Sequence, residues 1–424
     1  MKNAKDQPIK ILMVHKFFYV EGGAERYIFN LTDLLQSKGH QVIPFAAHHP
    51  NNYDTPYDKY FADSFTSGTH LKRQSIVNKT RSVLQFISNR DAQKKLTQLI
   101  RDTKPDVAHV HSIYHHLTPS ILQTLKAHDI PIMLTLHDYK LICPNYILMN
   151  GKRRICTSCH GKKFYQATLN KCFRDSRAAS LLISAEAYVH RLKHSYQDNV
   201  DLFVSPSRFL GDAVKHQGYP TKPFRIQPYT LDTNLYKPCY TPSDYFIFLG
   251  RLTHEKGLDF LFNAMKRING RLLVVGTGPL EEILKQRVER EHLNIQMLGY
   301  KQGDELRRLI ADARFTVVPS EWHDNSPLVI YESLALGNAV IGTRMGGIPE
   351  LITEGVDGYT FERGDIDDFV DKTNRLLENP NQTIDMGKRG RGKVEALYSY
   401  DQHYRKIIDL YNLTMKLHFK QQRA

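Results

Sequence analysis

Short apolar runs alternate along the chain with longer stretches in which apolar residues recur every three or four positions. Such runs predict buried strands, and such stretches predict helices with one buried face. In the first half, strands are predicted at Ile9–Val14, Val42–Ala46, Val107–Val110 and Ile132–Thr135. Glu25–Lys38 is the predicted helix after the first strand, with Gly39 as its stop signal. Strands that alternate with helices predict an α/β chain with a parallel sheet.

The second half repeats this alternation in layout, not in residues. Strands are predicted at Phe246–Leu249, Leu272–Val275, Ile295–Leu298, Phe315–Val318 and Ala339–Ile341, and helices at Leu258–Ile268, Leu280–Glu291, Asp304–Ala313 and Pro327–Leu336. The irregular, proline-marked stretch Ser205–Ser243 is the expected linker. We therefore expect an N-terminal domain over 1–205, a C-terminal domain over 206–399, and a last helix over 400–424 that is long enough to cross back to the first domain.

Composition places the chain among ordinary globular proteins. Hydrophobic residues make up 41% and charged residues 24%, which excludes a disordered or fibrous chain. No apolar run approaches the roughly 20 residues of a membrane span. Near the N-terminus only Ile11–Val14 is apolar, whereas a secretory signal needs about 7–15 such residues. Because five cysteines also argue against a secreted disulfide framework, we expect a protein that stays in the cytoplasm.

The positive charge is concentrated in the first half of the chain. Of the net charge of +14, residues 1–200 carry a surplus of 13 and residues 201–424 a surplus of 1. Nucleic acid is not an expected partner, because no helix-turn-helix, zinc-finger or RNP-like signature accompanies the charge. A solvated face, and an anionic membrane surface or phosphorylated acceptor, both stay open. The predicted helix Asp175–His194 has apolar spacing and basic ends, so it either packs on its own core or lies on an anionic bilayer.

Glycine turns follow the predicted strands of the second half. Gly250 opens a turn in which Arg251 and Lys256 precede a helix, a pattern typical of an anion site. Gly276 and Gly278 form a second turn, which lacks the third glycine of a dinucleotide fingerprint. A third glycine-rich loop, 342–350, follows the last predicted strand. Since ligands of open parallel sheets sit beyond the carboxyl ends of the strands, these turns are expected at one edge.

A further strand-to-helix junction covers residues 317–332. Asn325 and Ser326 are expected to cap the helix, with Pro327 in its first turn, so that exposed amides can receive a phosphate. Two carboxylates belong to this junction and have seven residues between them. Asp324 lies outside the helix start, and Glu332 lies in the second turn.

With these motifs the sequence resembles the retaining glycosyltransferases of family 4. The resemblance implies the GT-B architecture of the glycogen synthase-like superfamily, with two Rossmann-like doubly wound domains facing a central cleft. It covers nearly the whole chain. The matching segments are Gly22–Glu25, Pro105–His111, Thr135–Asp138, Gly250–Gly257, Gly276–Pro279, Pro319–Glu321, the Asp324 and Glu332 pair, and Gly346–Ile352.

The resemblance implies a donor site in the C-terminal domain. Arg251 and Lys256 would bind the donor diphosphate and offset charge on the leaving group, and Glu332 would hold the ribose hydroxyls. Asp324 stands where the family usually has a glutamate that contacts the sugar, so its shorter side chain implies an altered or water-mediated contact. The remaining donor-binding residues would be Gly276 and Gly278, together with the backbone of Asn325, Ser326, Pro327, Leu328 and Val329.

The resemblance also implies roles on the acceptor-side domain. His137 would approach the transferred sugar and stabilise positive charge near the anomeric carbon, although a satisfied loop histidine is the alternative. Gly22 and Gly23 would let the backbone approach the sugar and phosphates. A double displacement would need a second carboxylate, and no obvious Asp or Glu stands in the first-domain loops for that role. We therefore expect a reaction on one face of the sugar, with the departing phosphate taking the acceptor proton.

Four cysteines form a symmetric set within an insert at about 140–175. Cys156 and Cys159 make a CxxC pair, and Cys143 and Cys172 stand twelve residues outside it on either side. Four thiolates suit a structural zinc ion, whereas two disulfides or four reduced thiols are the alternatives. The family core requires no cofactor for catalysis, so any metal here would be structural.

The sequence thus predicts a hexosyltransferase that uses a nucleotide-diphosphate sugar and a glycan or lipid-linked acceptor in surface polysaccharide or glycolipid synthesis. The expected place is the cytoplasm, including the inner face of the membrane. Two alternatives remain: a nucleotide-sugar epimerase of the same fold, and a non-catalytic protein with a degenerate site that binds membranes or polyanions. The base of the nucleotide, the sugar, the acceptor and the linkage are left open.

Overall fold

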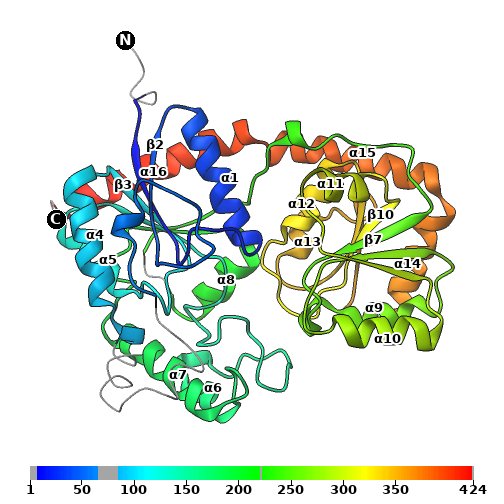
Figure 1. Cartoon of the computed structure of the whole chain (residues 1–424), viewed down its shortest axis with the longest axis horizontal. Coiled ribbons are helices and arrows are strands. Elements are labelled where there is room, and N and C mark those ends of the chain that lie inside the picture. Colours follow the sequence, from blue (N-terminus) through cyan, green and yellow to red (C-terminus); the bar gives the residue numbers. More distant parts are fainter. Residues whose placement is uncertain (1–6, 65–84, 220–221, 423–424) are drawn as a thin grey trace. The chain divides into compact units, whose positions relative to one another are not determined.

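The computed structural model describes residues 7–64, 85–219 and 222–422. The chain divides into two compact units (Figure 1). Unit 1 comprises residues 1–227 and 404–424, and unit 2 comprises residues 228–403. We describe each unit by itself.

Within the described residues of unit 1, six parallel strands form one sheet in the order β2-β1-β3-β4-β5-β6. They are β1 (Lys10–Val14), β2 (Gln41–Phe45), β3 (Val107–Val110), β4 (Ile132–Thr135), β5 (Leu202–Ser205) and β6 (Phe224–Ile226). The first four agree with the predicted strands to within one residue. The chain reverses its direction of winding between β1 and β3, so the loops after these two strands flank the switch point of the sheet.

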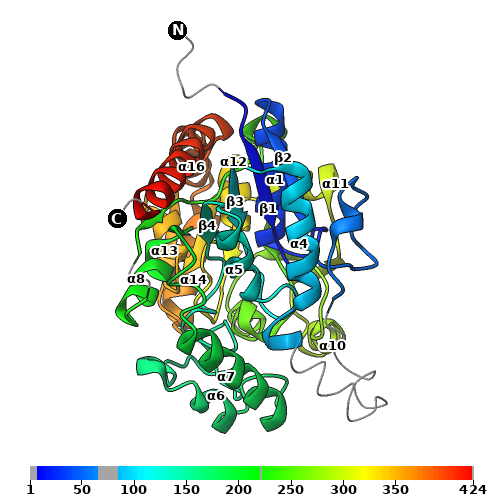
Figure 2. The same ribbon diagram turned by 90° about the vertical axis from the view of Figure 1, so that its left-hand side faces the viewer.

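Helices cover both faces of this sheet (Figure 2). They are α1 (Gly23–Ser37), α4 (Arg90–Thr103), α5 (Ser120–Ala127), α8 (Arg208–His216) and most of α16 (Tyr400–Gln422). Two further helices, α6 (Tyr165–Leu169) and α7 (Arg177–Leu192), pack against each other away from the faces of the sheet (Figure 2). Alternate residues of β3 face opposite sides of the sheet and therefore contact different helices. Ala108 and Val110 belong to the apolar core with α4 and α5, whereas the His109 ring bonds the Tyr411 hydroxyl of α16 at 2.9 Å.

The region expected to be the linker contains two elements of unit 1. Ser207 caps α8 by accepting a hydrogen bond from the backbone N–H of Leu210, and β6 pairs with β5. The structure therefore divides the chain after Gln227, not near residue 205. Both elements are short, and β6 is only partly buried, so neither produces a strong apolar period in the sequence.

The last helix is bound to unit 1 along its length. The His40 ring and the Tyr404 hydroxyl are 2.9 Å apart, and the His418 ring lies 3.0 Å from the Asp201 carboxylate. Ile407 and Tyr411 are fully buried. The structure thus groups this helix from Tyr404 onward with the first unit.

Every residue of unit 2 is described, and six parallel strands form its sheet in the order β12-β11-β10-β7-β8-β9. The strands are β7 (Tyr245–Leu249), β8 (Arg271–Val275), β9 (Ile295–Gly299), β10 (Phe315–Val318), β11 (Ala339–Thr343) and β12 (Gly358–Phe361). The helices are α9 (Leu258–Met265), α10 (Glu281–Glu291), α11 (Gly303–Ala311), α12 (Leu328–Ala335), α13 (Ile348–Leu351), α14 (Ile366–Glu378) and α15 (Pro380–Leu397). This strand order is that of a dinucleotide-binding Rossmann fold, with its switch point between β7 and β10. The predicted α/β class with two doubly wound sheets is confirmed.

Among the helices of the described residues, none combines the length and the apolar character that crossing a bilayer requires.

Candidate active site

Two loops meet at the switch point of unit 2, one after β7 and one after β10. The β7 loop contains a short 3-10 helix, His254–Lys256, and Gly257 follows it in a left-handed conformation with φ of +76°. A side chain at Gly257 would collide with the carbonyl of Pro319 in the β10 loop. The backbone N–H of Glu321 donates to the carbonyl of Glu255 at 2.8 Å. These close contacts fix Lys256 beside the β10 loop.

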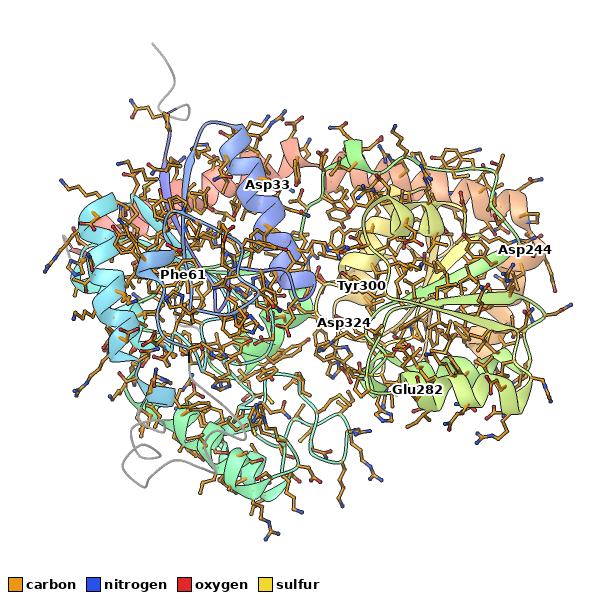
Figure 3. The ribbon with its side chains drawn as sticks, in the orientation of Figure 1. Asp33, Phe61, Asp244, Glu282, Tyr300 and Asp324 are labelled. Carbon is orange, nitrogen blue, oxygen red and sulfur yellow. The ribbon has the colours of Figure 1, made fainter. Side chains whose placement is uncertain are left out.

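Lys256 and Asp324 form the central ion pair of this edge. The Lys256 ammonium lies 2.6 Å from Oδ2 of Asp324, and the Ser320 hydroxyl donates to the same oxygen at 3.3 Å. Asp324 is buried, whereas the Lys256 side chain is 23% exposed. Figure 3 labels Asp324 in unit 2. The pair thus places a partly exposed cation over a buried carboxylate at the carboxyl edge of the sheet.

Arg251 belongs to the same loop but is held much less firmly. Its side chain is 73% exposed, and its guanidinium reaches Oε1 of Glu255 only at 3.7 Å. Glu255 in turn accepts a hydrogen bond from the Thr253 hydroxyl at 2.8 Å. Arg251 can therefore move toward an anion without breaking a buried contact.

The helix α12 starts beside Asp324 and carries Glu332. The expected side-chain cap is wrong: Pro327 occupies the cap position without a side-chain hydrogen bond, and the Ser326 hydroxyl instead pairs with the Tyr331 hydroxyl at 2.8 Å. Glu332 is buried and accepts a hydrogen bond from the Tyr236 hydroxyl at 3.3 Å. Tyr236 had no predicted role, because it lies 96 residues from Glu332 in the sequence.

Glycines at this edge allow neighbouring loops to touch. A side chain at Gly276, whose φ is +138°, would collide with the carbonyl of Gly250, and one at Gly278 would crowd the backbone of Leu252. In the loop after β11, the backbone N–H of Gly347 donates to the Asp324 carbonyl at 2.8 Å. Gly276 and Gly278 therefore serve loop packing in this structure, and their contact with a donor stays a prediction.

A chain of histidines lies at the carboxyl edge of the unit 1 sheet. Nε2 of His137, after β4, lies 2.8 Å from Nδ1 of His111, after β3. Nε2 of His111 lies 3.1 Å from the sulfur of Met13. Burial is the main cause that lowers the pKa of His137, to about 3. His137 is therefore neutral at physiological pH, the state in which an imidazole can stabilise positive charge.

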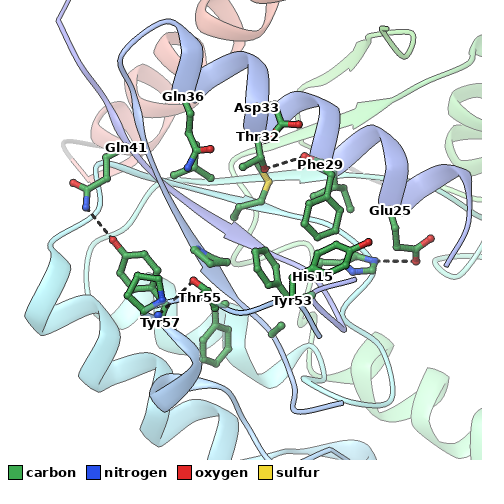
Figure 4. A pocket seen from close by; sticks show the side chains of 18 of the residues that line it. His15, Glu25, Phe29, Thr32, Asp33, Gln36, Gln41, Tyr53, Thr55 and Tyr57 are labelled. Carbon is green, nitrogen blue, oxygen red and sulfur yellow. Dashed lines mark hydrogen bonds and ion pairs between the residues drawn. The ribbon is translucent and has the colours of Figure 1, made fainter. Parts of the chain in front are cut away.

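Two carboxyl groups stand close to these histidines, and sequence reasoning missed both as site candidates. Glu25, in the first turn of α1, is buried with Oε1 at 3.4 Å from Nε2 of His15 (Figure 4). Burial opposes its ionisation, but His15 and Lys16 outweigh burial and lower its pKa. Asp138 is half-buried, and the loss of water around its carboxyl group raises its pKa to about 7. Glu25 lies in a helix and not in a first-domain loop, so the expectation that those loops offer no obvious carboxylate for a double displacement stays a prediction.

Gly22 and Gly23 form the start of α1. Gly22 has extended backbone, with φ of −154°, and a side chain there would meet Glu25 only at an ordinary contact distance of 3.4 Å. Both glycines are exposed. The structure therefore gives no conformational reason for glycine at position 22, and an approach of the backbone to a ligand stays a prediction.

Acidification is expected to destabilise unit 1 through His137. Because its pKa is 6.5 when unfolded and about 3 when folded, the unfolded chain binds the proton more tightly between these values. Stability is complete above pH 6.5 and falls by up to about 1.4 kcal/mol per pH unit as the pH drops toward 3. Urea unfolding at pH 7 and pH 4.5 should show a smaller pH effect in His137→Gln than in the wild type. An equal pH effect in both proteins would contradict the assigned pKa.

The four cysteines of the insert line one cavity of about 190 Å³. They are Cys143, Cys156, Cys159 and Cys172, and all four are free thiols. Two disulfides are therefore not the state of this structure. Nevertheless, no group of three or more His, Cys, Asp or Glu residues in the described part of the chain is arranged to hold a metal ion. The spacing correctly predicted that the thiols lie around one cavity, and a structural zinc ion there stays a prediction.

Comparison with known proteins gives two adjoining family matches. The family model described as Glycosyltransferase Family 4 matches residues 21–235, which is half of the chain, and that of Glycosyl transferases group 1 matches residues 238–393. The chain belongs to glycosyltransferase family 4. Membership in this family makes the protein a transferase by class, and its two units are the two Rossmann-like domains of the GT-B fold.

Two relatives of this family 4 chain are named after the cps region and after amylovoran biosynthesis. An uncharacterized 42.6 kDa protein in the cps region of Klebsiella pneumoniae is 25% identical over 81% of this chain and 87% of that protein. The amylovoran biosynthesis glycosyltransferase AmsK of Erwinia amylovora is 25% identical over 44% of this chain and 48% of AmsK. Several other curated relatives are matched over less than half of their length.

The fold agrees with solved family structures. Anabaena HepE in complex with UDP-glucose matches with a TM-score of 0.64 and 16% identity, over 95% of this chain and 99% of HepE. At this identity the likeness establishes the fold alone. The family 4 motifs on Arg251, Lys256, Asp324 and Glu332 gather at one sheet edge of unit 2, while their individual roles stay predictions.

Proposed function

We propose that this protein transfers a hexosyl unit from a nucleotide-diphosphate sugar to a glycan or lipid-linked acceptor, in the synthesis of a surface polysaccharide or glycolipid. The observation that carries this proposal is the Lys256–Asp324 pair beside the start of α12, at the switch point of a Rossmann sheet. A structural neighbour binds UDP-glucose, and AmsK is named for amylovoran biosynthesis.

The charges of unit 2 suit a departing diphosphate. The ammonium of Lys256, the exposed guanidinium of Arg251 and the amide end of α12 all favour negative charge at this edge. Such preorganised groups stabilise the charge that develops when the sugar–phosphate bond breaks. Glu332, oriented by the Tyr236 hydroxyl, supplies a carboxylate for ribose hydroxyls. We expect Asp324 to contact the sugar in an altered or water-mediated way.

On the acceptor-side domain, unit 1, the neutral imidazole of His137 can stabilise the oxocarbenium character that develops on the sugar. We expect retention of configuration through reaction on one face, with the departing phosphate taking the acceptor proton. Glu25 is the carboxylate that a double displacement would use instead, so a covalent glycosyl–enzyme adduct on Glu25 would contradict the one-face reaction.

Purified protein should be screened with UDP- and GDP-sugars for thermal stabilisation, hydrolysis and transfer, with NMR assignment of the product anomer. Stabilisation by one nucleotide sugar, with slow hydrolysis and retained configuration, supports the proposal. Interconversion of two sugars without transfer would point to an epimerase, and no nucleotide binding at all would point to a degenerate site.

An anionic membrane surface is the partner that we propose for helices α6 and α7. Residues 150–194 carry ten Lys and Arg against two Asp and Glu. The buried face of α7 is largely small and polar, with Ser180, Ser184 and Glu186, whereas its exposed face carries Leu181 and Leu192. These leucines are 59% and 78% exposed and lie about three turns apart on one side of the helix. Exposed leucines among cations are typical of helices that lie in a bilayer interface.

We expect unit 1 to bind vesicles that contain phosphatidylglycerol at low salt and to release them at high salt. Leu181→Glu combined with Leu192→Glu should weaken this binding about ten-fold or more, since each buried leucine contributes about 1.5–3 kcal/mol. Ile283→Glu is the matched control, because Ile283 is 61% exposed on α10 of unit 2. Equal vesicle binding by the double variant and the control would contradict the assigned face.

A further inference from the structure

A cavity of about 640 Å³ lies in unit 1, along one face of α1 (Figure 4). On one side it is lined by α1 residues that recur at helical spacing, and on the other by the segment 53–57. Strand β2, at the edge of the sheet, forms its floor through Val42, Pro44 and Phe45. Its size is that of a small-molecule site, and the proposed donor site in unit 2 does not use it.

The cavity has two ends of different character. One end is at the carboxyl edge of the sheet, where His15 and Glu25 line it and where the charge of Glu25 also acts on His137. The other end is at the amino edge, where Gln36 and Gln41 line it and the Gln41 amide donates to the Tyr57 hydroxyl at 3.1 Å. From Glu25 to Gln36 the helix rises about 16 Å. The cavity is therefore a groove that leads away from His137.

Aromatic rings and polar groups share the lining of this groove. Phe29 lies 5.1 Å from the ring of Phe18 and 5.2 Å from that of Tyr53, which is half exposed. Successive turns of α1 add Thr32, Asp33 and Gln36 (Figure 4). Each part of the groove thus combines an apolar face with a hydrogen-bonding group.

We propose that this groove binds the neutral glycan portion of the acceptor, with the reacting sugar at the His15 and Glu25 end. This inference rests on the proposed glycosyltransferase function and assigns the acceptor subsite of that function to particular residues.

The charges of the lining favour a neutral ligand. Glu25, Asp33 and Asp54 line the groove, and no Lys or Arg is among the described residues that do so. Burial lowers the pKa of both His15 and His40, so neither adds a positive charge at neutral pH. A phosphate or a uronic acid would meet three carboxyl groups, of which Glu25 already pairs with the Lys16 ammonium at 3.5 Å, so the lining offers an anion no unpaired cation of its own.

The polar groups favour a sugar over an aliphatic chain. A lipid chain in the groove would remove water from Asp33 and Gln36 without giving them new hydrogen-bond partners, which costs free energy at each group. A glycan offers hydroxyls to these groups and places its apolar ring faces on Phe29 and Tyr53.

The test fills the groove and leaves the donor site untouched. Thr32→Trp places a large ring in the middle of the groove, and Asp33→Asn changes one polar group with little change in volume. Ser37→Trp is the matched control, because Ser37 is exposed at the end of the same helix and does not line the groove. The full-length protein is assayed against an array of neutral di- to hexasaccharides, against uronic-acid oligosaccharides and against a polyprenyl phosphate. Nucleotide binding is measured on every variant.

We expect the wild type and Ser37→Trp to bind at least one neutral oligosaccharide. Thr32→Trp should bind the same oligosaccharide at least about ten-fold more weakly, and the affinity of Asp33→Asn should lie between the two. All four proteins should bind nucleotide equally. Three results would each overturn the inference. The wild type could bind nucleotide but no neutral glycan, Thr32→Trp could bind the glycan as tightly as the wild type, or the variants could lose binding only to the uronic-acid oligosaccharides or the polyprenyl phosphate. Absence of nucleotide binding would instead overturn the proposed function.

Discussion

Replacement of Lys256 by alanine is expected to weaken binding of the cognate nucleoside diphosphate about 10- to 100-fold. The Lys256 ammonium is placed by the contact between Gly257 and Pro319 and by its 2.6 Å pair with Asp324. A hydrogen bond to a charged group contributes about 1.5–3 kcal/mol, which corresponds to this range. The loss has a second source, because the buried Asp324 carboxylate would then face the diphosphate without its cation. Isothermal titration of UDP and GDP measures the effect.

Three further variants make this prediction specific. Arg251→Ala should cost less than Lys256→Ala, because Arg251 is 73% exposed and must be ordered when the ligand binds. Lys388→Ala is the charge-matched control, since Lys388 pairs with Asp385 in the exposed part of α15 and should not affect titration. Lys256→Ala with Asp324→Asn should recover part of the affinity. Binding by Lys256→Ala within two-fold of the wild type would remove the main support for the donor site.

Replacement of Glu186 by alanine is expected to destabilise unit 1 by about 3–5 kcal/mol. Glu186 on α7 and Lys140 after β4 are 2.7 Å apart, and their side chains are only 1% and 7% exposed. The variant would leave the Lys140 ammonium buried and without a carboxylate partner, donating to the carbonyl of Pro144 at 3.1 Å. Urea unfolding followed by circular dichroism measures the loss. Trp322 is the single tryptophan of the chain, so its fluorescence follows unit 2 separately.

Two comparisons test whether the buried charge of Lys140 causes the loss of stability in Glu186→Ala: replacement of an exposed ion pair, and replacement of both members of the buried pair. Asp367→Ala removes a partner of Arg267 at the surface of unit 2, where both side chains are at least half exposed, and should cost less than about 1 kcal/mol. Lys140→Met with Glu186→Leu removes both charges and should restore most of the stability. If the double variant were as unstable as Glu186→Ala, packing and not charge would explain the effect.

Local patterns were sufficient for the framework of this protein. An apolar run or a 3.6-residue period is a property of neighbouring residues, so β1, β3, β4 and the elements from β7 to β11 could be placed from sequence. The glycine turns at Gly250 and Gly276 could be placed for the same reason, since turn chemistry is local. Because parallel strands direct their carboxyl ends to one edge, the gathering of Arg251, Lys256, Asp324 and Glu332 also followed from the order of elements along the chain.

Pairings between distant residues were decided only by the tertiary structure. Lys140 and Glu186, 46 residues apart, and Tyr236 and Glu332, 96 apart, have no local pattern that could reveal them. The same holds for Glu25 beside His15, for the groove along α1 and for the burial that keeps His137 neutral. Burial and charge at a site depend on which segments fold over it, and that depends on the packing of the whole unit. The amino-acid order therefore determined the two sheets and the edge where chemistry gathers, while packing determined the protonation, the partners and the space available to a ligand.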